Sequence, residues 1–458
     1  FMADIGRILV NVYKKDTFVP LKDVKIIMNP SEDESKRVEL TTNSVGQTET
    51  VDVNTPPIEL SLRPEYTEMP YSLWDVRAEA PGFEPVEIRN AQILPDSTAI
   101  QNIELLGNPS ESREMGEFRT IDVPDNRLFG TFPPKIPEAP EKPLPKSPGG
   151  GFVVLDEVVV PEFVIVHAGV PTNTGAPSYK VPFKDYIKNV ASSEIYSTWP
   201  ENTIRANIYC ILSFTLNRIF TEWYTGKGYT FTITNSTAFD HAFTYGRNIF
   251  DNISRIVDEI FTSYIKRRGA KQPLLTQYCD GERVKCPGWL TQWGSKYLGD
   301  QGRTPYEILT NFYGTDIDIE KAPKVSGIPK SYPGYTLQIG SSGDPVTTIQ
   351  TFLNRIGDNY PLIPKVAVDG VYGQSTADAV KIFQKIFNLP QTGVVDYSTW
   401  YQISNIYVGV TKIAELRSSM GINDNEVESV AREMGIFVPP TFIIGRSLDV
   451  PTIDYPVK

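Results

Sequence analysis

The chain of 458 residues has only three cysteines and two histidines. Three cysteines exclude a small secreted scaffold held by many disulfides, and two histidines leave almost no ligands for a histidine-rich catalytic metal site. Basic residues are also the minority, since 44 Lys and Arg stand against 55 Asp and Glu, a net charge of −11. Nucleic acid is therefore excluded as an expected partner, because it is bound through a basic surface. We expect no metal and no other cofactor.

Long apolar runs are missing too. No stretch approaches the roughly 18 consecutive apolar residues that a membrane-spanning helix needs, so no membrane span is expected. Residues 1–10 contain no cationic segment followed by an apolar one, and no signal peptide is visible.

Proline is abundant, with 37 of 458 residues, against a usual share of about 5%. So much proline excludes an all-helical bundle and indicates β-rich parts and linkers. The length suggests about three domains. We expect a β-sandwich over residues 1–130, a linker over 131–151, an α+β domain over 152–335, and a small all-α domain with a C-terminal extension over 336–458.

Residues 6–106 show short runs of alternating apolar residues separated by Gly, Pro and Asn. The runs are 8–12, 24–28, 38–40, 51–53, 74–78, 86–88 and 100–105. This pattern predicts an antiparallel β-sandwich. With the turn sequences PLKDV and APGFEP, it resembles the prealbumin-like accessory modules of carboxypeptidases and surface proteins. That resemblance implies a structural or regulatory role, and the region shows no catalytic constellation.

The linker 131–151 holds seven prolines and ends in three glycines. Its proline-rich part is expected to be an extended, semi-rigid spacer. The glycines form a flexible point that a protease could bind in extended form. A plain linker and a processing site both remain open.

In the middle segment, residues 158–167 are expected to form a strand, and residues 199–224 a helix. Thr198 is the expected N-cap, with Glu201 completing a capping box and Gly226 closing the helix. A second helix is expected over residues 249–268.

The C-terminal segment contains LQIGSSGDPVTTIQTFL, DGVYGQSTADAVKIFQ and TGVVDYSTW, within residues 336–400. This is similar to the peptidoglycan-binding domain of cell-wall hydrolases, which implies three helices and two tight turns. Most matching residues are core positions. The surface near the turn of Asp369 and Tyr372 is the predicted binding point, and a purely structural role for these residues stays open. Residues 412–418 and 425–434 are expected to form short helices.

The middle segment carries a second resemblance, in SEIYSTWP (193–200) and in GERVKCPGWLTQWGSKYLGDQGRTPYEILTNFYG (281–314). These sequences resemble the catalytic domain of the stage II sporulation protein D family. The resemblance implies a lytic transglycosylase with Glu194 as its acid/base. Where that family has Gly-His-Gly, this chain has Lys285-Cys286-Pro287, and its Ser-Gln pair is Thr291-Gln292 here.

A single glutamate suits this chemistry. Ordinary glycosidases use two carboxylates, whereas in a lytic transglycosylase the C6 hydroxyl of the muramic acid attacks its own C1. One carboxyl group can protonate the leaving oxygen and then take the C6 proton. The residues expected to contact the glycan, with loop packing as the alternative, are Tyr278, Asp280, Thr291, Gln292 and Trp293.

The remaining cysteines and histidines have simpler expected roles. Cys279 and Cys286 could form a disulfide or stay reduced, and Cys210 is expected in the core. His167 and His241 are expected to be structural.

In its order of segments the whole chain resembles the clostridial spore cortex-lytic enzymes. This resemblance implies a zymogen that a subtilisin-like germination protease cuts near Gly151, Phe152, Val153 and Val154. It implies spore cortex peptidoglycan as substrate, and a place in the cortex or coat region outside the spore core. The alternative is a non-catalytic peptidoglycan-binding scaffold of the coat or wall. A wall amidase or endopeptidase is disfavoured, because it needs a zinc site or a Cys–His pair.

Overall fold

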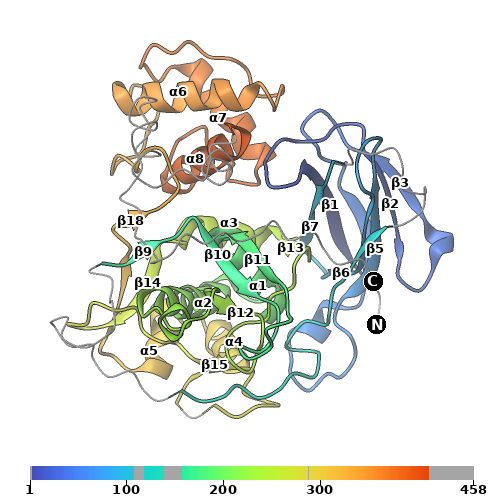
Figure 1. Cartoon of the computed structure of the whole chain (residues 1–458), viewed down its shortest axis with the longest axis vertical. Helices are drawn as coiled ribbons and strands as arrows, with labels where there is room; N and C mark the ends of the chain where they lie inside the picture. The colour runs from blue at the N-terminus through green and yellow to red at the C-terminus, as the bar shows by residue number, and fades with distance from the viewer. Residues whose placement is uncertain (1–2, 108–117, 139–156, 287, 412–458) are drawn as a thin grey trace.

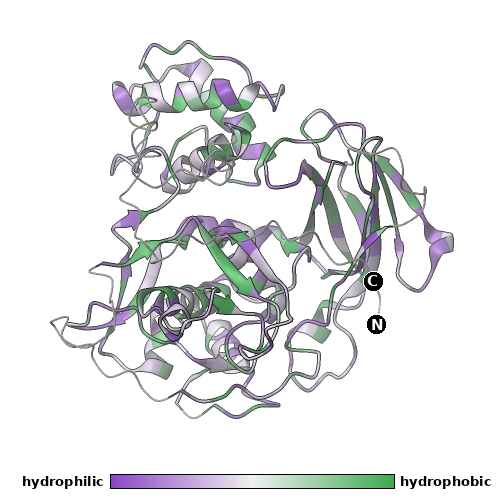
Figure 2. Ribbon diagram, viewed as in Figure 1, coloured by the Kyte–Doolittle hydropathy of each residue, from purple (hydrophilic) through white to green (hydrophobic). Residues whose placement is uncertain are grey.

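The computed structural model describes residues 3–107, 118–138, 157–286 and 288–411. Figure 1 shows three parts: a two-sheet unit in blue, a mixed helix and strand segment in green and yellow, and a group of orange helices above it. In Figure 2 the strands of the two-sheet unit carry much of the strongly hydrophobic colour.

The N-terminal unit consists of two sheets that enclose an apolar core. One has the order β3-β2-β5-β6-β8 and the other β13-β7-β1-β4. The strands are β1 (Asp4–Lys14), β2 (Lys25–Pro30), β3 (Val38–Thr41), β4 (Val51–Thr55), β5 (Ser72–Glu79), β6 (Val86–Ile93), β7 (Thr98–Leu105), β8 (Arg119–Asp122) and β13 (Ile249–Phe250). Ile8, Val10 and Val12 are fully buried, so the alternation that predicted these strands is confirmed.

The prediction of a purely antiparallel sandwich is wrong in two places. Strand β1 pairs with β7 in parallel, and β6 pairs with β8 in parallel. Parallel neighbours need long connections, and both pairs join strands that are not consecutive in the chain. Strand β13, from the middle segment, pairs with Ala99 and Ile100 of β7, so this sheet continues across the expected domain boundary.

The middle segment is built around the helix α2 (Glu201–Phe220), most of whose residues are buried. Its other helices are α1 (Phe183–Glu194), α3 (Asp251–Ile260), α4 (Gln292–Asp300) and α5 (Pro305–Tyr313). Its strands are β9 (Val159–Val160), β10 (Phe163–His167), β11 (Ser178–Pro182), β12 (Ile233–Thr234), β14 (Ser263–Arg267), β15 (Tyr278–Cys279), β16 (Leu290–Thr291), β17 (Ile317–Lys321) and β18 (Lys324–Val325). The strand expected over residues 158–167 is confirmed as two pieces, β9 and β10.

Both helix predictions for this segment need correction at their ends. Pro200 stands at the N-cap of α2 without a side-chain cap, and the hydroxyls of Thr198 and Ser61 lie 2.7 Å apart. Glu201 bonds Arg205 instead of completing a capping box. The helix ends at Phe220, and the left-handed glycine that follows is Gly228.

The predicted helix over residues 249–268 is helical only in α3. Residues 263–267 form β14, which pairs with β17 in antiparallel register. The helical spacing of apolar residues continues into this strand because Tyr264 and Ile265 are buried in the same core, and partner strands decide such ambiguous runs.

The C-terminal unit contains α6 (Asp344–Gly357), α7 (Gln374–Ile386) and α8 (Tyr397–Thr411). The three expected helices are confirmed. Its lead-in is tied by bridges from Leu337 to Val395 and from Ser342 to Val371, and Trp400 is 1% exposed. Residues 412–418 and 425–434, expected to be helical, lie outside the described residues.

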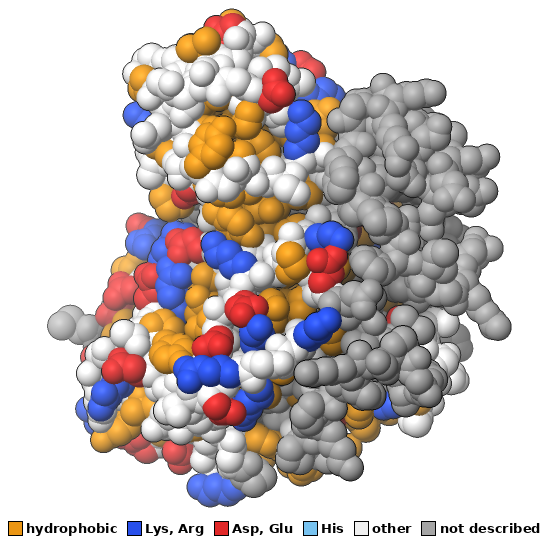
Figure 3. All heavy atoms as spheres, turned by 90° about the vertical axis from the view of Figure 1, so that its left-hand side faces the viewer, with side chains coloured by type: hydrophobic (Ala, Val, Ile, Leu, Met, Phe, Trp, Pro, Cys, Tyr) orange, Lys and Arg blue, Asp and Glu red, His pale blue; other side chains and the backbone are white. Residues whose placement is uncertain are grey.

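The C-terminal unit packs against both other parts. Tyr360 donates a hydrogen bond to the Phe18 carbonyl at 2.6 Å, and Gln47 Nε2 donates to the Ile386 carbonyl at 2.8 Å. Figure 3 shows hydrophobic side chains gathered on the face of this unit and at its junction with the segment below. Within the described residues, no helix is both long and apolar enough to cross a membrane.

Candidate active site

Glu194 is the last residue of α1, and its side chain is fully buried. Its Oε1 accepts a hydrogen bond from the Ala242 backbone N–H at 2.6 Å, and its Oε2 accepts one from the Tyr278 hydroxyl. Gln292 Nε2 donates to the Glu194 carbonyl at 3.1 Å. The Ala242 N–H and the Tyr278 hydroxyl therefore fix the carboxyl group, and Gln292 holds the backbone of the same residue. Two of the predicted substrate residues, Tyr278 and Gln292, thus contact Glu194.

His241 precedes Ala242 in the chain, and its ring contacts those of Phe214 and Tyr278. The His241 ring centroid is 4.6 Å from that of Phe214 and 5.8 Å from that of Tyr278. Burial lowers the pKa of His241 well below its ordinary value, and burial raises the pKa of Tyr278 well above its own. Both groups are neutral near pH 7. Across the described chain, His241 Nε2 and Gln292 Oε1 are buried atoms without a hydrogen-bond partner.

The other predicted substrate residues lie next to this centre in different roles. Trp293 is 9% exposed and its ring lies 5.0 Å from that of Trp199. Asp280 Oδ1 accepts the backbone N–H groups of residues 282, 283 and 284, so its carboxylate holds a loop. Thr291 stands at the N-cap of α4 without a side-chain cap.

Cys279 and Cys286 form a disulfide, which decides between the two open alternatives. It closes the loop that Asp280 holds. Cys210 is free and buried, as expected of a core residue.

A small pocket of about 30 Å³ lies beside Trp293. The middle segment contributes Tyr196, Trp293, Asp280, Glu282 and Arg283 to its lining. The N-terminal part contributes Leu60, Arg63, Pro64, Tyr66, Glu68, Pro70, Leu128 and Phe129. The pocket therefore combines aromatic rings and charged groups from two parts of the chain.

Residues 126–138, which we call the strap, run from the N-terminal unit across the Glu194 site. Asn126 Nδ2 donates to the carbonyls of Ser192 and Ile195 at 3.3 and 3.2 Å. The Arg127 backbone N–H donates to Ser193 at 2.8 Å, and its guanidinium lies 3.9 Å from Glu194 Oε2. The strap therefore brings a buried positive charge to the predicted acid.

Residues 131–138 belong both to the strap and to the expected linker, and Lys135 is their buried side chain. It is 5% exposed, so the described part of the linker, 131–138, is not a free spacer. Its ammonium donates to the Asp240 carbonyl at 3.1 Å and lies 4.2 Å from the ring centre of Phe214 and 4.9 Å from that of Tyr278. Burial, aided by the charge of Arg127, lowers the pKa of Lys135 to about 7.

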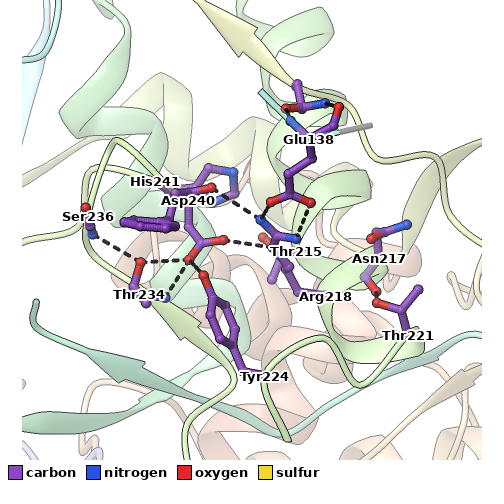
Figure 4. Close-up of polar contacts among 12 residues, drawn as sticks. Glu138, Thr215, Asn217, Arg218, Thr221, Tyr224, Thr234, Ser236, Asp240 and His241 are labelled. Atoms are coloured by element: carbon purple, nitrogen blue, oxygen red, sulfur yellow. Dashed lines mark hydrogen bonds and ion pairs between the residues drawn. The ribbon is translucent and has the colours of Figure 1, made fainter. Parts of the chain in front are cut away.

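The strap ends in an ion pair that Figure 4 shows. Both terminal nitrogens of Arg218, on α2, bond the carboxylate of Glu138, at 3.0 and 2.5 Å. Arg218 Nε bonds Asp240 Oδ1 at 2.8 Å. Asp240 Oδ2 accepts from the Tyr224 hydroxyl at 2.6 Å and from the N–H and hydroxyl of Thr234 at 3.0 and 2.7 Å.

Sequence reasoning missed the strap and its partners, because no local motif marks them. Each contact joins residues more than 60 positions apart in the chain, Arg127 with Glu194 and Glu138 with Arg218. Glu138 also lies in a segment whose composition indicates a spacer. The one available signal was the unusual placement of a Lys and a Glu three residues apart inside a proline-rich run.

In the C-terminal unit, the two predicted binding residues support the fold of their turn. Asp369 Oδ1 accepts hydrogen bonds from the Val371 N–H and from Gln350 Nε2, both at 2.9 Å, and these bonds lower the pKa of Asp369. Tyr372 is 1% exposed and donates to the Gly393 carbonyl at 2.9 Å. Three exposed apolar side chains lie near them, namely Ile339, Val368 and Val371.

The expected activation region and the possible metal ligands remain to be placed. Gly151, Phe152, Val153 and Val154, the expected activation region, lie outside the described residues. Within the described ranges, no group of three or more His, Cys, Asp or Glu side chains is arranged to hold a metal ion.

Comparison with known families identifies the C-terminal unit. Residues 342–403 match the family described as "Putative peptidoglycan binding domain". The chain therefore carries a peptidoglycan-binding domain at this position, and this match supports peptidoglycan as its partner. No curated protein matches the chain.

Solved structures with partial similarity include the SleB N-terminal domain, at 28% identity over 17% of this chain and 99% of that chain, with a TM-score of 0.15. The Bacillus anthracis TIE protein is 11% identical over 23% of this chain and 17% of its own, with a TM-score of 0.16. The 3-chlorocatechol 1,2-dioxygenase of Rhodococcus opacus 1CP is 12% identical over 23% and 60%, also with a TM-score of 0.16. The family match alone carries the conclusion, since these TM-scores are too low for an argument.

Proposed function

We propose that this chain is the zymogen of a lytic transglycosylase that cleaves spore cortex peptidoglycan during germination, like the clostridial cortex-lytic enzyme SleC. The observation that carries the proposal is a buried, hydrogen-bonded Glu194 that a strap covers, in a chain with a peptidoglycan-binding domain. The proposed place of action is the cortex or coat region outside the spore core.

Glu194 would do the proton transfers of this reaction. It would protonate the oxygen that leaves with GlcNAc as the MurNAc–GlcNAc bond breaks. The MurNAc C6 hydroxyl would attack C1 to close the 1,6-anhydro ring, and Glu194 would take the C6 proton. A tyrosine hydroxyl can donate to a carboxylate and accept from a carboxylic acid, so Tyr278 can contact both forms of Glu194.

The strap supports the zymogen part of the proposal. In the intact chain it is tethered at both ends and is therefore held at high effective concentration over Glu194. A cut by a subtilisin-like protease in the Gly151–Val154 region would leave the strap on the N-terminal fragment. Its contacts with Ser192, Ser193 and Ile195 would then no longer be intramolecular, so dissociation of the strap is favoured at low protein concentration.

The activity is tested by digesting spore cortex with the linker-cleaved protein and analysing the fragments by mass spectrometry. We expect 1,6-anhydro-muramic ends from the wild type and a decrease of at least about 100-fold for Glu194→Gln, the order of general acid–base catalysis. Glu320→Gln, at an exposed carboxylate of β17, is the matched control and should retain activity. Reducing ends from the wild type would instead indicate a hydrolase.

A non-catalytic wall or coat scaffold is the second candidate. It is favoured by Lys285 and Cys286, which stand where the resembled family has a histidine motif, and by the disulfide that occupies Cys286. A scaffold would sediment with peptidoglycan through residues 342–403, while the turbidity of the wall suspension stayed constant.

A further inference from the structure

The strap does more than cover Glu194, because it also places a carboxylate on Arg218. Phe214 and Arg218 are one turn apart on α2, and the Arg218 guanidinium lies 4.6 Å from the Phe214 ring centre. The Phe214 ring in turn contacts the Lys135 ammonium, which also lies over Tyr278. Tyr278 bonds Glu194, so a line of contacting side chains, with Lys135 of the strap in its middle, joins the predicted acid to Arg218.

Arg218 is held in a fixed orientation without any help from the strap. Its Nε bonds Asp240, whose other oxygen already accepts three hydrogen bonds from Tyr224 and Thr234. The two terminal nitrogens bind Glu138 in the two-pronged geometry typical of arginine and carboxylate. Besides this pair, Nη2 makes a longer bond to the Phe239 carbonyl at 3.3 Å. The chain outside the strap has thus built a receptor for a carboxylate, and Glu138 occupies it.

When the strap leaves, the terminal nitrogens of this buried guanidinium would lose the Glu138 carboxylate, and they would keep only the longer bond from Nη2 to the Phe239 carbonyl at 3.3 Å. An unpaired buried donor is costly, and burial of this arginine is compatible with its charge because Asp240 stays beside it. A carboxylate of the incoming ligand would restore the lost hydrogen bonds. The muropeptide chains of peptidoglycan carry carboxylates on their stem peptides, close to the sugar on which Glu194 would act.

We infer that Arg218 binds a carboxylate of the peptidoglycan stem peptide, and that the Glu138 carboxylate occupies the same position in the uncleaved chain. This inference rests on the proposed function, since it assigns a substrate group to the same site. It makes Arg218 a specificity-determining residue, and the strap an internal copy of one charged part of the substrate.

The test is calorimetric titration of the full chain, nicked within residues 139–156 by a site-specific protease. The ligand is the disaccharide tripeptide GlcNAc-MurNAc-tripeptide, and its twin has all carboxylates converted to amides. Neither ligand contains a MurNAc–GlcNAc bond of the cleaved type, so binding is measured without turnover. We expect the amidated twin to bind at least about tenfold more weakly, as loss of a charge-assisted pair implies.

Arg218→Gln should bind both ligands equally, whereas Arg205→Gln, on the same helix but outside this line of contacts, should keep the preference. Because Arg218→Gln leaves Asp240 without its partner, Arg218→Lys serves as the second variant. It keeps the charge but not the planar pair of donors, and should keep only part of the preference.

Equal binding of both ligands by the wild type, or binding of neither, would overturn the inference. The proposed function has a separate readout, because absence of anhydro-muramic products would contradict it even if the carboxylate preference were found.

Discussion

Lys135 is the residue whose ionisation is most tightly coupled to the covered state. In that state burial lowers its pKa to about 7, from an ordinary value of 10.5. Release of the strap into water restores the ordinary value, so release takes up a proton between these two pKa values. The covered state is therefore favoured most above pH 10.5 and loses stability as the pH falls towards 7. Below pH 7 this group has no further effect.

This coupling predicts that the strap of the uncleaved chain opens more as the pH is lowered from 9.5 to 7.5. Hydrogen-exchange protection factors of amides in residues 126–138, corrected for intrinsic exchange rates, should fall over this range. In Lys135→Met the pH dependence should be nearly flat, since the titrating group is gone. Lys180→Met, at an exposed lysine of β11, is the control. An unchanged slope in Lys135→Met would show that another group governs opening.

The strap is the element on which the zymogen proposal depends. Asn126, its first residue, anchors it to the middle segment. The Asn126 amide donates to two carbonyls at the end of α1 and accepts the Leu128 N–H. It is 1% exposed. Its hydrogen bonds therefore join the strap to the helix that carries Glu194.

Asn126→Ala should increase the lytic activity of the uncleaved chain. Loss of two hydrogen bonds at about 1 kcal/mol each corresponds to roughly a 30-fold rise in the open population. The rate of cortex solubilisation by protein with an intact linker measures this effect. Asn388→Ala, which removes a bond between α7's C-terminal side and Asp251, should leave the rate as it is. A rate for Asn126→Ala equal to that of the wild type would argue against occlusion by the strap.

At the scale of elements, the sequence predicted what local patterns determine. The strands of the sandwich follow from strict alternation, as at Ile8, Val10 and Val12, and the three C-terminal helices follow from apolar spacing and turn glycines. Pairing partners are not local, so the apolar spacing predicts helix over residues 263–267, where the structure has a strand. The capping box expected at Thr198 does not form, because the helix begins at Glu201 and the Thr198 hydroxyl contacts Ser61 at the end of the 3-10 helix Ile58–Ser61. A capping box is present at Thr304 and Glu307.

The residues of the candidate site also divide into those that the sequence predicts and those that only the structure shows. Glu194, Tyr278 and Gln292 were predicted through family motifs, and the structure brings them into contact. Lys135, Glu138 and Arg218 were not predicted, because their meaning arises only when residues from separate segments meet. Tyr372 was assigned to binding because the turn beside it is distinctive, whereas its ring fills the core of that unit.

At the scale of the whole molecule, one buried ion cluster joins the middle segment to the C-terminal helices. Asp258 of α3 bonds Lys184 at 2.9 Å and Lys188 at 2.8 Å, both on α1. Lys184 also bonds Gln402 of α8. Burial acts to raise the pKa of Asp258, but the two ammonium groups outweigh it and lower that pKa below its ordinary value.

Asp258→Asn should destabilise the protein by about 3–5 kcal/mol, because two buried lysines would lose their counter-charge. Urea unfolding at pH 7 measures this loss. The stability that the carboxylate contributes is present above its unfolded pKa and declines as the pH falls below about 4, so the difference between variant and wild type should narrow in acid. Asp318→Asn, at an exposed pair on β17, should change stability by less than about 0.5 kcal/mol.

The central claim is that the three parts form one covered enzyme, which becomes active when the strap is freed from its tether. The most direct measurement is the yield of 1,6-anhydro-muramic ends from purified cortex, by mass spectrometry, for the same protein before and after cleavage within residues 139–156. We predict few or no such ends from the intact chain and abundant ends after cleavage. Equal yields from both forms, or no anhydro ends from either, would contradict it.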